Sequence, residues 1–315
     1  MNESDQISLP AAYDARIDIR ELLRVLWAGK WVIGGITFAG VAVSVTVALM
    51  LPNIYRAEAL LAPNQEQSAG GLSALAAQYG GLASLAGINI ANESSDKTAL
   101  GLEILKSRKF ISEFIERHDI LVPLMAAKGW DPETGDLEID AGIYDESESA
   151  WVRNAKAPRK STPSLQEAYE DFSDNNLSIT QSKTTGFIIV SVEHYSPIVA
   201  RQWVDWLVQD INTTVMRQDV DEAEQAIAYL EEQISATSLA ELQNVFFKLI
   251  EEQTKIVLLA KVSPEYLFRT IDPAVVPELK TKPRRAWIAA LGLILGGAIG
   301  IFVVLIQGRT ARQQE

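Results

Sequence analysis

Hydrophobic residues are concentrated in two long blocks near the ends of the chain. Residues 31–51 and 286–306 each provide 21 positions without an Asp, Glu, Lys or Arg. At about 1.5 Å per residue, a helix of this length spans roughly 31 Å, the thickness of a bilayer's hydrocarbon core. The pattern therefore predicts two transmembrane helices. We expect the first to be retained, because its apolar run exceeds that of a signal peptide and Ala48-Leu49-Met50 lacks a small last residue.

A short amphipathic pattern precedes the first block. Its apolar positions follow helical spacing and are Ile19, Leu22, Leu23 and Leu26. Asp18 and Glu21 form a capping-box pattern at the start. Residues 1–30 are therefore expected to form a cytoplasmic segment with an amphipathic helix on the membrane surface, or else a plain helical turn that leads into the span.

An uncharged tract of 26 residues, 67–92, follows a predicted strand that ends at Pro63. The tract is long enough for a third span. However, its five glycines and scattered Ser and Gln disfavour both a helix and transfer into lipid. A mobile Gly/Ala-rich loop with a short helix is the preferred interpretation.

Strand and helix periods alternate in the middle of the chain. Residues 98–118 show one helical pattern, and "LSITQ" and "FIIVSVEH" predict two strands joined by a turn near Gly186. Ser196-Pro197 then opens a helix that runs through Val215, as an N-cap followed by a first-turn proline. "YLFRTIDPAVVP" predicts a last strand.

Two further helical patterns precede that strand, one on each side of residues 238–241. Their apolar positions, which we expect to make helix or oligomer contacts, are Ile227, Leu230 and Ile234, then Leu242, Val245 and Leu249. "SLAE" at Ser238 to Glu241 has the form of a capping box. The pattern favours a helical hairpin, and a single kinked helix is the alternative.

These elements predict an α+β membrane protein with two transmembrane helices, an α/β base and a helical extension, as a hairpin or coiled structure. The predicted parts are the segment 1–30, transmembrane helix 31–51, a periplasmic domain 52–285, transmembrane helix 286–306 and a cytoplasmic tail 307–315. The first and last strands each adjoin a span. Their pairing would bring the two spans together.

Charge predicts the orientation in the membrane. The cations Arg16, Arg20, Arg24 and Lys30 precede the first span, which places the N-terminus, and after two spans the C-terminus, in the cytoplasm. The loop 52–285 has 35 acidic and 22 basic residues, so nucleic acid is an improbable partner. The chain has no cysteine, which excludes disulfides, thiol nucleophiles and zinc–thiolate sites and suits a bacterial periplasm.

Signatures of catalysis and of metal or cofactor binding are missing from the sequence. It contains no Walker A motif, and its two histidines, His118 and His194, lie 76 residues apart without metal-ligand spacing. The acidic stretch 131–148 lacks the pattern of a calcium loop and is expected to be a solvated excursion. We therefore predict no catalytic, cofactor or metal site and no enzyme activity.

Small residues recur at every fourth position within both apolar blocks. They are Gly40, Ser44 and Ala48 in the first block and Gly292, Gly296 and Gly300 in the second. Such ridges let helix backbones approach closely. They predict packing between the two spans, within one protomer or between protomers, although a merely apolar anchor would also contain small residues.

A proline-rich and basic stretch leads into the second block. It contains Pro273, Pro277 and Pro283, and the cations Lys280, Lys282, Arg284 and Arg285. The prolines predict a stiff connector. Because the preceding loop is long, these cations need not lie in the cytoplasm, and each is expected to gain roughly 1 kcal/mol from anionic lipid headgroups.

The series of motifs resembles the Wzz-type chain-length determinants, the class 1 polysaccharide co-polymerases. The resemblance rests on "IDIRELLRVLWAGKWVI", "YRAEALLAP", "LEILKSRKF", "LLAKVSPEYLFRTIDPAVVPE" and the proline-basic approach to the second span. The family's proline-rich motif corresponds to Pro273, Pro277 and Pro283 followed by Gly292 and Gly296. The chain departs from the family in carrying Lys282 where a Ser often precedes the last proline.

The resemblance implies a homo-oligomer in the bacterial inner membrane, with a periplasmic base and helical extension. It implies a non-catalytic protein that sets the length of a lipid-linked polysaccharide, such as O-antigen, together with a Wzy-type polymerase. The alternative is the membrane adaptor of a split tyrosine-kinase or export system. A kinase partner would dock on a cytoplasmic tail, and residues 307–315 contain no tyrosine.

Overall fold

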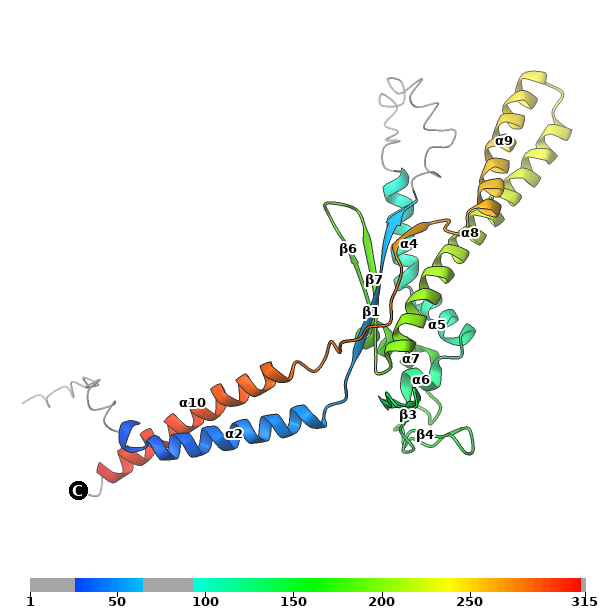
Figure 1. Cartoon of the computed structure of the whole chain (residues 1–315). Helices are drawn as coiled ribbons and strands as arrows, with labels where there is room; N and C mark the ends of the chain where they lie inside the picture. The colour runs from blue at the N-terminus through cyan, green and yellow to red at the C-terminus, as the bar shows by residue number, and fades with distance from the viewer. Residues whose placement is uncertain (1–25, 65–92, 313–315) are drawn as a thin grey trace, which may run out of the picture. The chain divides into compact units, whose positions relative to one another are not determined.

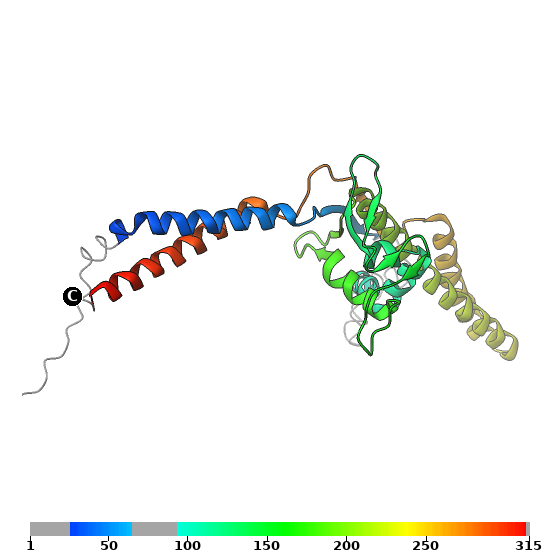
Figure 2. The same ribbon diagram turned by 90° about the horizontal axis from the view of Figure 1, so that it is seen from below.

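The computed structural model describes residues 26–64 and 93–312, with side chains over 26–64 and 97–307. The chain divides into two compact units, Met1–Leu51 with Pro283–Glu315, and Pro52–Lys282. The first unit contains helices α2 (Lys30–Met50) and α10 (Arg285–Arg312), which run side by side in Figures 1 and 2. By length and composition, Lys30–Met50 and Arg285–Gln307 are both able to cross a membrane.

The second unit has an α+β fold with a central antiparallel sheet and a long helical hairpin (Figure 1). Its elements in chain order are β1 (Tyr55–Pro63), α4 (Glu93–Lys106), α5 (Arg108–Arg117), α6 (Leu121–Met125), β2 (Ala127–Trp130), β3 (Leu137–Ile139), β4 (Tyr144–Asp145), β5 (Ala150–Trp151), α7 (Leu165–Asp171), the π-helical turn η3 (Phe172–Asn176), β6 (Leu177–Gln181), β7 (Ile188–His194), α8 (Pro197–Ala236), α9 (Ala240–Val262) and β8 (Phe268–Asp272).

The main sheet has the strand order β6-β7-β1-β8, with every neighbouring pair antiparallel. In β1, Ala57, Ala59 and Leu61 are buried, whereas Glu58 between them is exposed, as the period of two requires for a sheet with one covered face. The first and last strands, whose pairing would bring the two spans together, are paired as β1 and β8. The predicted hairpin of β6 and β7 is also confirmed, with Gly186 at φ +73° in its turn.

The hydrophobic core lies between the covered face of this sheet and the helices. The ring of Phe172 lies 5.7 Å from those of both Phe114 and Trp203, measured between centroids. These rings come from η3, α5 and α8, and all three are fully buried. Burial of large aromatic side chains therefore joins the local helices to the long helix.

Ser107 divides the helix predicted over 98–118 into α4 and α5. Its backbone is extended (φ −66°, ψ 144°), and its hydroxyl accepts a hydrogen bond from the Phe110 amide at 3.2 Å. The prediction of one helix was therefore wrong, because the apolar spacing continued across a residue whose side chain favours an N-cap.

Helix α8 extends over 40 residues, whereas the sequence predicted one helix through Val215 and a separate helix that carries Ile227, Leu230 and Ile234. The intervening Met216, Arg217 and Gln218 are good helix formers, so nothing interrupts the backbone hydrogen bonds. The predicted hairpin is confirmed as α8 followed by α9. The predicted capping box is absent, since the N-cap of α9 is Leu239, without a side-chain hydrogen bond.

Two predictions concern residues outside the described ranges. These are the amphipathic segment before residue 26 and the Gly/Ala-rich tract 67–92.

The side chain of Asn212 connects α8 to the start of β8. Its amide nitrogen donates to the Val208 and Phe268 carbonyls at 3.0 and 3.1 Å, and its oxygen accepts from the Leu267 and Phe268 amides at 2.7 and 2.8 Å. Asn212 is only 3% exposed. Its hydrogen bonds therefore satisfy backbone groups that water does not reach.

We expect Asn212→Ala to lower the free energy of unfolding by roughly 3 kcal/mol, because it leaves buried backbone groups of β8 without partners. Chemical denaturation of the full chain in detergent measures the change. Thr213→Ala is the matched control, since the Thr213 hydroxyl bonds only the Gln209 carbonyl of its own helix. Equal effects of the two substitutions would contradict this role of Asn212.

His194 is a buried, neutral residue at the end of β7. Its Nε2 lies 3.0 Å from the Pro123 carbonyl and its Nδ1 accepts from the Ser196 amide at 3.1 Å, so Nε2 carries the proton. Burial lowers the pKa of His194 from 6.5 to about 4. The cause is the cost of burying the charged imidazolium.

The folded state should therefore become less stable in mild acid. Above pH 6.5 the histidine is neutral in both states, but between about 6.5 and 4 only the unfolded chain binds the proton. This difference amounts to roughly 3 kcal/mol lost by about pH 4. Denaturation measured across this pH range tests it, and His194→Gln should flatten that part of the profile. An unchanged profile in the variant would contradict the assignment.

Candidate functional site

The predicted small residues of the two membrane-length helices face one another within a single chain. A Cβ added to Gly40 of α2 would lie 3.1 Å from both the Gly292 carbonyl oxygen and the Gly296 Cα of α10. A Cβ on Gly296 would meet the Thr37 Cα at 3.0 Å. Glycine at these positions therefore allows the two backbones to touch.

The contact continues toward both ends of this helix pair. Gly292 lies against the side chain of Ser44, and a Cβ on Gly300 would lie 3.0 Å from the Ile33 Cα. Ala48 is buried, and its carbonyl accepts a hydrogen bond from Arg285 Nε at 3.1 Å. Arg285 thus pairs with one of the last carbonyls of α2, where a cation is favoured by the helix dipole. We call this line of contact between α2 and α10 the glycine seam. All six predicted small residues lie in it or beside it.

The predicted basic residues lie just before α10 or at its first position. The polar contacts that they make are to residues of the same unit. Lys282 Nζ lies 2.6 Å from Glu193 Oε2, and Lys280 Nζ donates to Asn53 Oδ1 at 2.9 Å. Arg284 is exposed. Three of the four predicted cations, counting Arg285, therefore have polar partners other than lipid, and any contact with headgroups remains a prediction.

The chain enters and leaves the second unit side by side. The Ile54 amide donates to the Lys282 carbonyl at 2.9 Å, and the Thr281 amide donates to the Ile54 carbonyl at 2.8 Å. Pro273 and Pro277 lie between β8 and this bridge, outside helices and strands, and Pro283 begins the segment assigned to the first unit. These prolines have no N–H and cannot extend the sheet.

The hairpin separates the six predicted contact residues into two groups. Ile227, Leu230 and Ile234 are half-buried on α8. Leu242, Val245 and Leu249 on α9 are 43%, 51% and 45% exposed. The less exposed residues of α9 begin one position later along the helix, at Gln243, Phe246 and Ile250. Further along they are Glu252, Gln253, Ile256, Val257, Leu259 and Ala260.

Gln243 fixes this register at the tip of the hairpin. Its side-chain nitrogen donates to the Thr237 carbonyl at 2.8 Å, just beyond the end of α8. Spacings of three and four residues then carry the inner face along α9. Two polar residues, Gln243 and Gln253, belong to it, which is why the apolar pattern alone predicted the neighbouring row.

Exposed apolar residues lie on both sides of α9. We call Leu242, Val245 and Leu249 the first flank, and Phe247, Leu258 and Val262 the second flank. The residues of the second flank are 55%, 58% and 74% exposed. At about 100° per residue, the two flanks lie on roughly opposite sides of the helix, with the inner face between them. The apolar pattern in the sequence predicted the first flank but not the second, because polar residues such as Glu251 separate Phe247 from Leu258.

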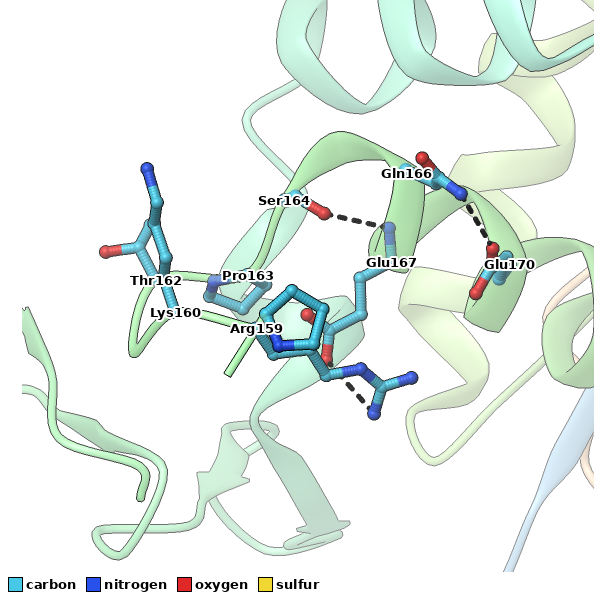
Figure 3. A pocket seen from close by; sticks show the side chains of 9 residues that line it. Arg159, Lys160, Thr162, Pro163, Ser164, Gln166, Glu167 and Glu170 are labelled. Atoms are coloured by element: carbon cyan, nitrogen blue, oxygen red, sulfur yellow. Dashed lines mark hydrogen bonds and ion pairs between the residues drawn. The ribbon is translucent and has the colours of Figure 1, made fainter. Parts of the chain in front are cut away.

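A polar cavity of about 680 Å³ lies beside α7 (Figure 3). Arg153 and Glu167 form a bidentate ion pair there, with Nη1–Oε1 and Nη2–Oε2 distances of 2.5 and 2.7 Å. The pairing lowers the pKa of the Glu167 carboxyl and raises that of the Arg153 guanidinium, mainly through these hydrogen bonds. No pattern in the sequence predicted this ion pair.

Both histidines have packing partners. His118 Nε2 lies 3.0 Å from Asp210 Oδ2, and its ring stacks on Trp206 at 4.2 Å. Within the described residues, no group of three His, Cys, Asp or Glu side chains is arranged to hold a metal ion.

Two family models match parts of the chain. The model described as chain length determinant protein (Wzz) matches residues 15–118, and the model described as a G-rich domain on putative tyrosine kinase (GNVR) matches residues 241–309. The first match spans α2, β1, α4 and α5, and the second spans α9, β8 and most of α10. No curated protein matches the sequence.

Two solved structures are similar at low identity. A full-length bacterial polysaccharide co-polymerase is 14% identical, with 94% of this chain and 99% of that one covered and a TM-score of 0.40. A fragment of WzzB, the polysaccharide co-polymerase from Salmonella Typhimurium, is 14% identical, with 73% and 100% covered and a TM-score of 0.30.

The glycine seam leads to a prediction with a matched control. Gly296→Leu should separate α2 from α10, because its Cβ would lie 3.0 Å from backbone of the facing helix. Gly297→Leu should not, since only the Thr37 hydroxyl lies near its Cβ, at 3.8 Å.

The absence of cysteine makes this measurable by disulfide formation. Gly29 and Val304 lie in contact, so Gly29→Cys with Val304→Cys should cross-link in the otherwise unchanged chain. Adding Gly296→Leu should reduce the yield several-fold, and adding Gly297→Leu should leave it unchanged. Equal yields in both backgrounds would contradict the seam.

Proposed function

Because the chain belongs to the Wzz chain length determinant family, we propose that it sets the length of a bacterial surface polysaccharide without catalysing its synthesis. It is a Wzz-type polysaccharide co-polymerase. The polymer we propose is O-antigen-like and lipid-linked. The chain would act as an oligomeric scaffold for a Wzy-type polymerase in the inner membrane.

The two exposed flanks of α9 carry the proposal of a scaffold. Large apolar side chains that are exposed together on one side of a helix mark a surface that another molecule covers. A second copy of this chain offers the same flanks, so apolar area on one hairpin can be buried by its neighbour. The flanks lie in the unit that we propose to be periplasmic.

The position of the flanks on opposite sides favours head-to-tail assembly. A two-fold dimer would use one self-complementary patch, whereas a head-to-tail contact joins two different patches and continues from copy to copy. Such a series closes into a ring when the rotation between neighbours allows it. We therefore propose that the first flank of each hairpin contacts the second flank of the next.

The glycine seam supports a membrane anchor built within one protomer. Both helices of a protomer would cross the inner membrane, with the two termini in the cytoplasm, as Arg16, Arg20, Arg24 and Lys30 favour. The second unit, which the chain enters and leaves side by side, would then lie in the periplasm.

A non-catalytic role agrees with the chemistry of the described residues. Charged groups there form ion pairs such as Arg153–Glu167 and Lys282–Glu193, and both histidines hold helices and strands together. None of these groups forms a nucleophile–base pair of the kind that glycosyl transfer or hydrolysis requires.

A second candidate function is favoured by the GNVR match over 241–309, a domain described from putative tyrosine kinases. In this alternative, the chain is the membrane adaptor of a kinase-linked export system. Deletion of the gene would then abolish tyrosine phosphorylation of a cytoplasmic ATPase. Loss of a defined polymer length with phosphorylation unchanged would instead support the co-polymerase.

We expect Leu249→Asp to weaken oligomers and to broaden the polysaccharide length distribution in a strain that lacks the native gene, because a carboxylate would have to be buried between hairpins. Gel electrophoresis of the surface polysaccharide and size measurement of the purified protein are read together. Gln225→Asp places the same charge at an exposed position of α8, outside both flanks, and is the control.

In the deletion strain itself, polymer should still form but without a preferred length. Loss of all polymer would contradict a non-catalytic regulator. A Leu249→Asp protein that remains oligomeric and restores the normal length would contradict the role of the first flank.

A further inference from the structure

We propose that the cavity beside α7 binds a hydroxyl-rich sugar unit of the polysaccharide. The cavity has a volume of about 680 Å³, within the range of small-ligand sites. Its polar lining residues include Arg159, Lys160, Thr162, Gln166, Glu167 and Glu170. Figure 3 shows these side chains on α7 and on the loop that precedes it.

Arg153 fixes the wall of the cavity from behind. Besides its ion pair with Glu167, its Nε donates to the Ser161 carbonyl at 2.7 Å and its Nη2 to the Lys160 carbonyl at 3.0 Å. One guanidinium thus ties the loop that precedes α7 to the first turn of that helix. The side chains of Arg153 and Glu167 are 17% and 13% exposed.

A loop held in this way needs little ordering when a ligand binds. Bidentate guanidinium–carboxylate pairs have a defined geometry, and their shielding from water strengthens them. Binding by pre-ordered groups avoids an entropy cost that a free loop would impose. Arg159 Nη1 also lies 3.9 Å from Glu167 Oε1, so a second cation of the loop is close to the same carboxylate.

The lining offers donors and acceptors close together. Gln166 Nε2 donates to Glu170 Oε1 at 3.2 Å, which orients both side chains one turn apart on α7. The Gln166 carbonyl and the second Glu170 oxygen remain as acceptors, while Arg159, Lys160 and Thr162 supply donors. A hydroxyl group both donates and accepts, so neighbouring hydroxyls on a sugar ring match this arrangement.

The charged groups of the wall largely compensate one another. Glu167 is paired with Arg153 and lies 3.9 Å from Arg159, while Lys160 and Glu170 carry opposite charges. One positive charge is therefore in excess over these five groups, and hydroxyl groups match the mixed donors and acceptors better than a multiply charged anion does. Pro158 adds exposed apolar surface against which a ring can pack.

The inference rests on the proposed function for its source of ligand, but it is tested by binding alone. The probe is a set of oligosaccharides of a few repeat units, released by mild acid from the surface polysaccharide of the cell that encodes the chain. Full-length protein in lipid nanodiscs is titrated with them. Saturation-transfer NMR reports the contact and gives the dissociation constant.

We expect the double substitution Gln166→Ala with Glu170→Ala to weaken binding about tenfold or more, as the loss of one to two hydrogen bonds implies. The matched control is Gln218→Ala with Glu222→Ala, an exposed Gln and Glu also four residues apart, on α8. Because Gln166 and Glu170 are exposed, the double variant should fold, and thermal unfolding checks that it does.

Arg153→Gln tests the role of the fixed loop separately. We expect it to weaken binding while the cavity side chains remain, because the loop would lose its hydrogen bonds to Arg153.

Three results would overturn the proposal. The first is that the native chain does not bind the oligosaccharides. The second is that the cavity variant and the control variant lose the same amount of affinity. The third is that only Arg269→Ala weakens binding. This would place the sugar in a different cavity, of about 630 Å³, which Arg269 lines. If deletion of the gene still abolishes the preferred polymer length, each of these outcomes leaves the proposed function intact.

Discussion

The fold of the second unit depends on the hydrogen bonds of one buried side-chain amide, that of Asn212. It holds β8 to α8, and β8 in turn pairs with β1. Beyond β8 the chain runs to Lys282, which hydrogen-bonds Ile54 just before β1. The segments that adjoin the two membrane-length helices are thus neighbours in one fold. This fits a protein whose two spans must pair, and it leaves the hairpin free for contacts with other molecules.

The two units are stabilised by different physical effects. In the second unit, burial of aromatic and aliphatic side chains from water supplies the driving force. In a membrane that force between helices is absent, and close backbone contact through glycine takes its place. Thr37 and Ser44 satisfy their hydroxyls on carbonyls of their own helix, at 2.8 Å each, so the seam contains no unpaired hydroxyl at these positions. The same small residues that weaken a soluble helix therefore make this pair.

Sequence periodicity predicted the membrane-length helices, the β6–β7 pairing and the helical hairpin, because each depends on a regular local repeat. The β1–β8 pairing joins strands from opposite ends of the domain, and only their positions next to the two spans suggested it. It failed where one polar side chain decides the outcome. Ser107 divides a helix whose apolar spacing is continuous, and Gln243 shifts the inner face of α9 by one position. The Arg153–Glu167 pair that shapes the cavity joins residues 14 positions apart and leaves no repeat in the sequence. Such tertiary contacts have no signature in a single sequence.

The central claim is that hairpins assemble with the first flank of one copy against the second flank of the next. Each protomer then needs both flanks to continue the assembly. The most direct measurement mixes two full-length variants, Leu249→Asp on the first flank and Leu258→Asp on the second, and determines particle mass in detergent. Each variant alone should be monomeric, and the mixture should form dimers and nothing larger, because one native contact remains available per pair. Full-size oligomers of either variant alone, or a mixture that stays monomeric, would contradict the claim.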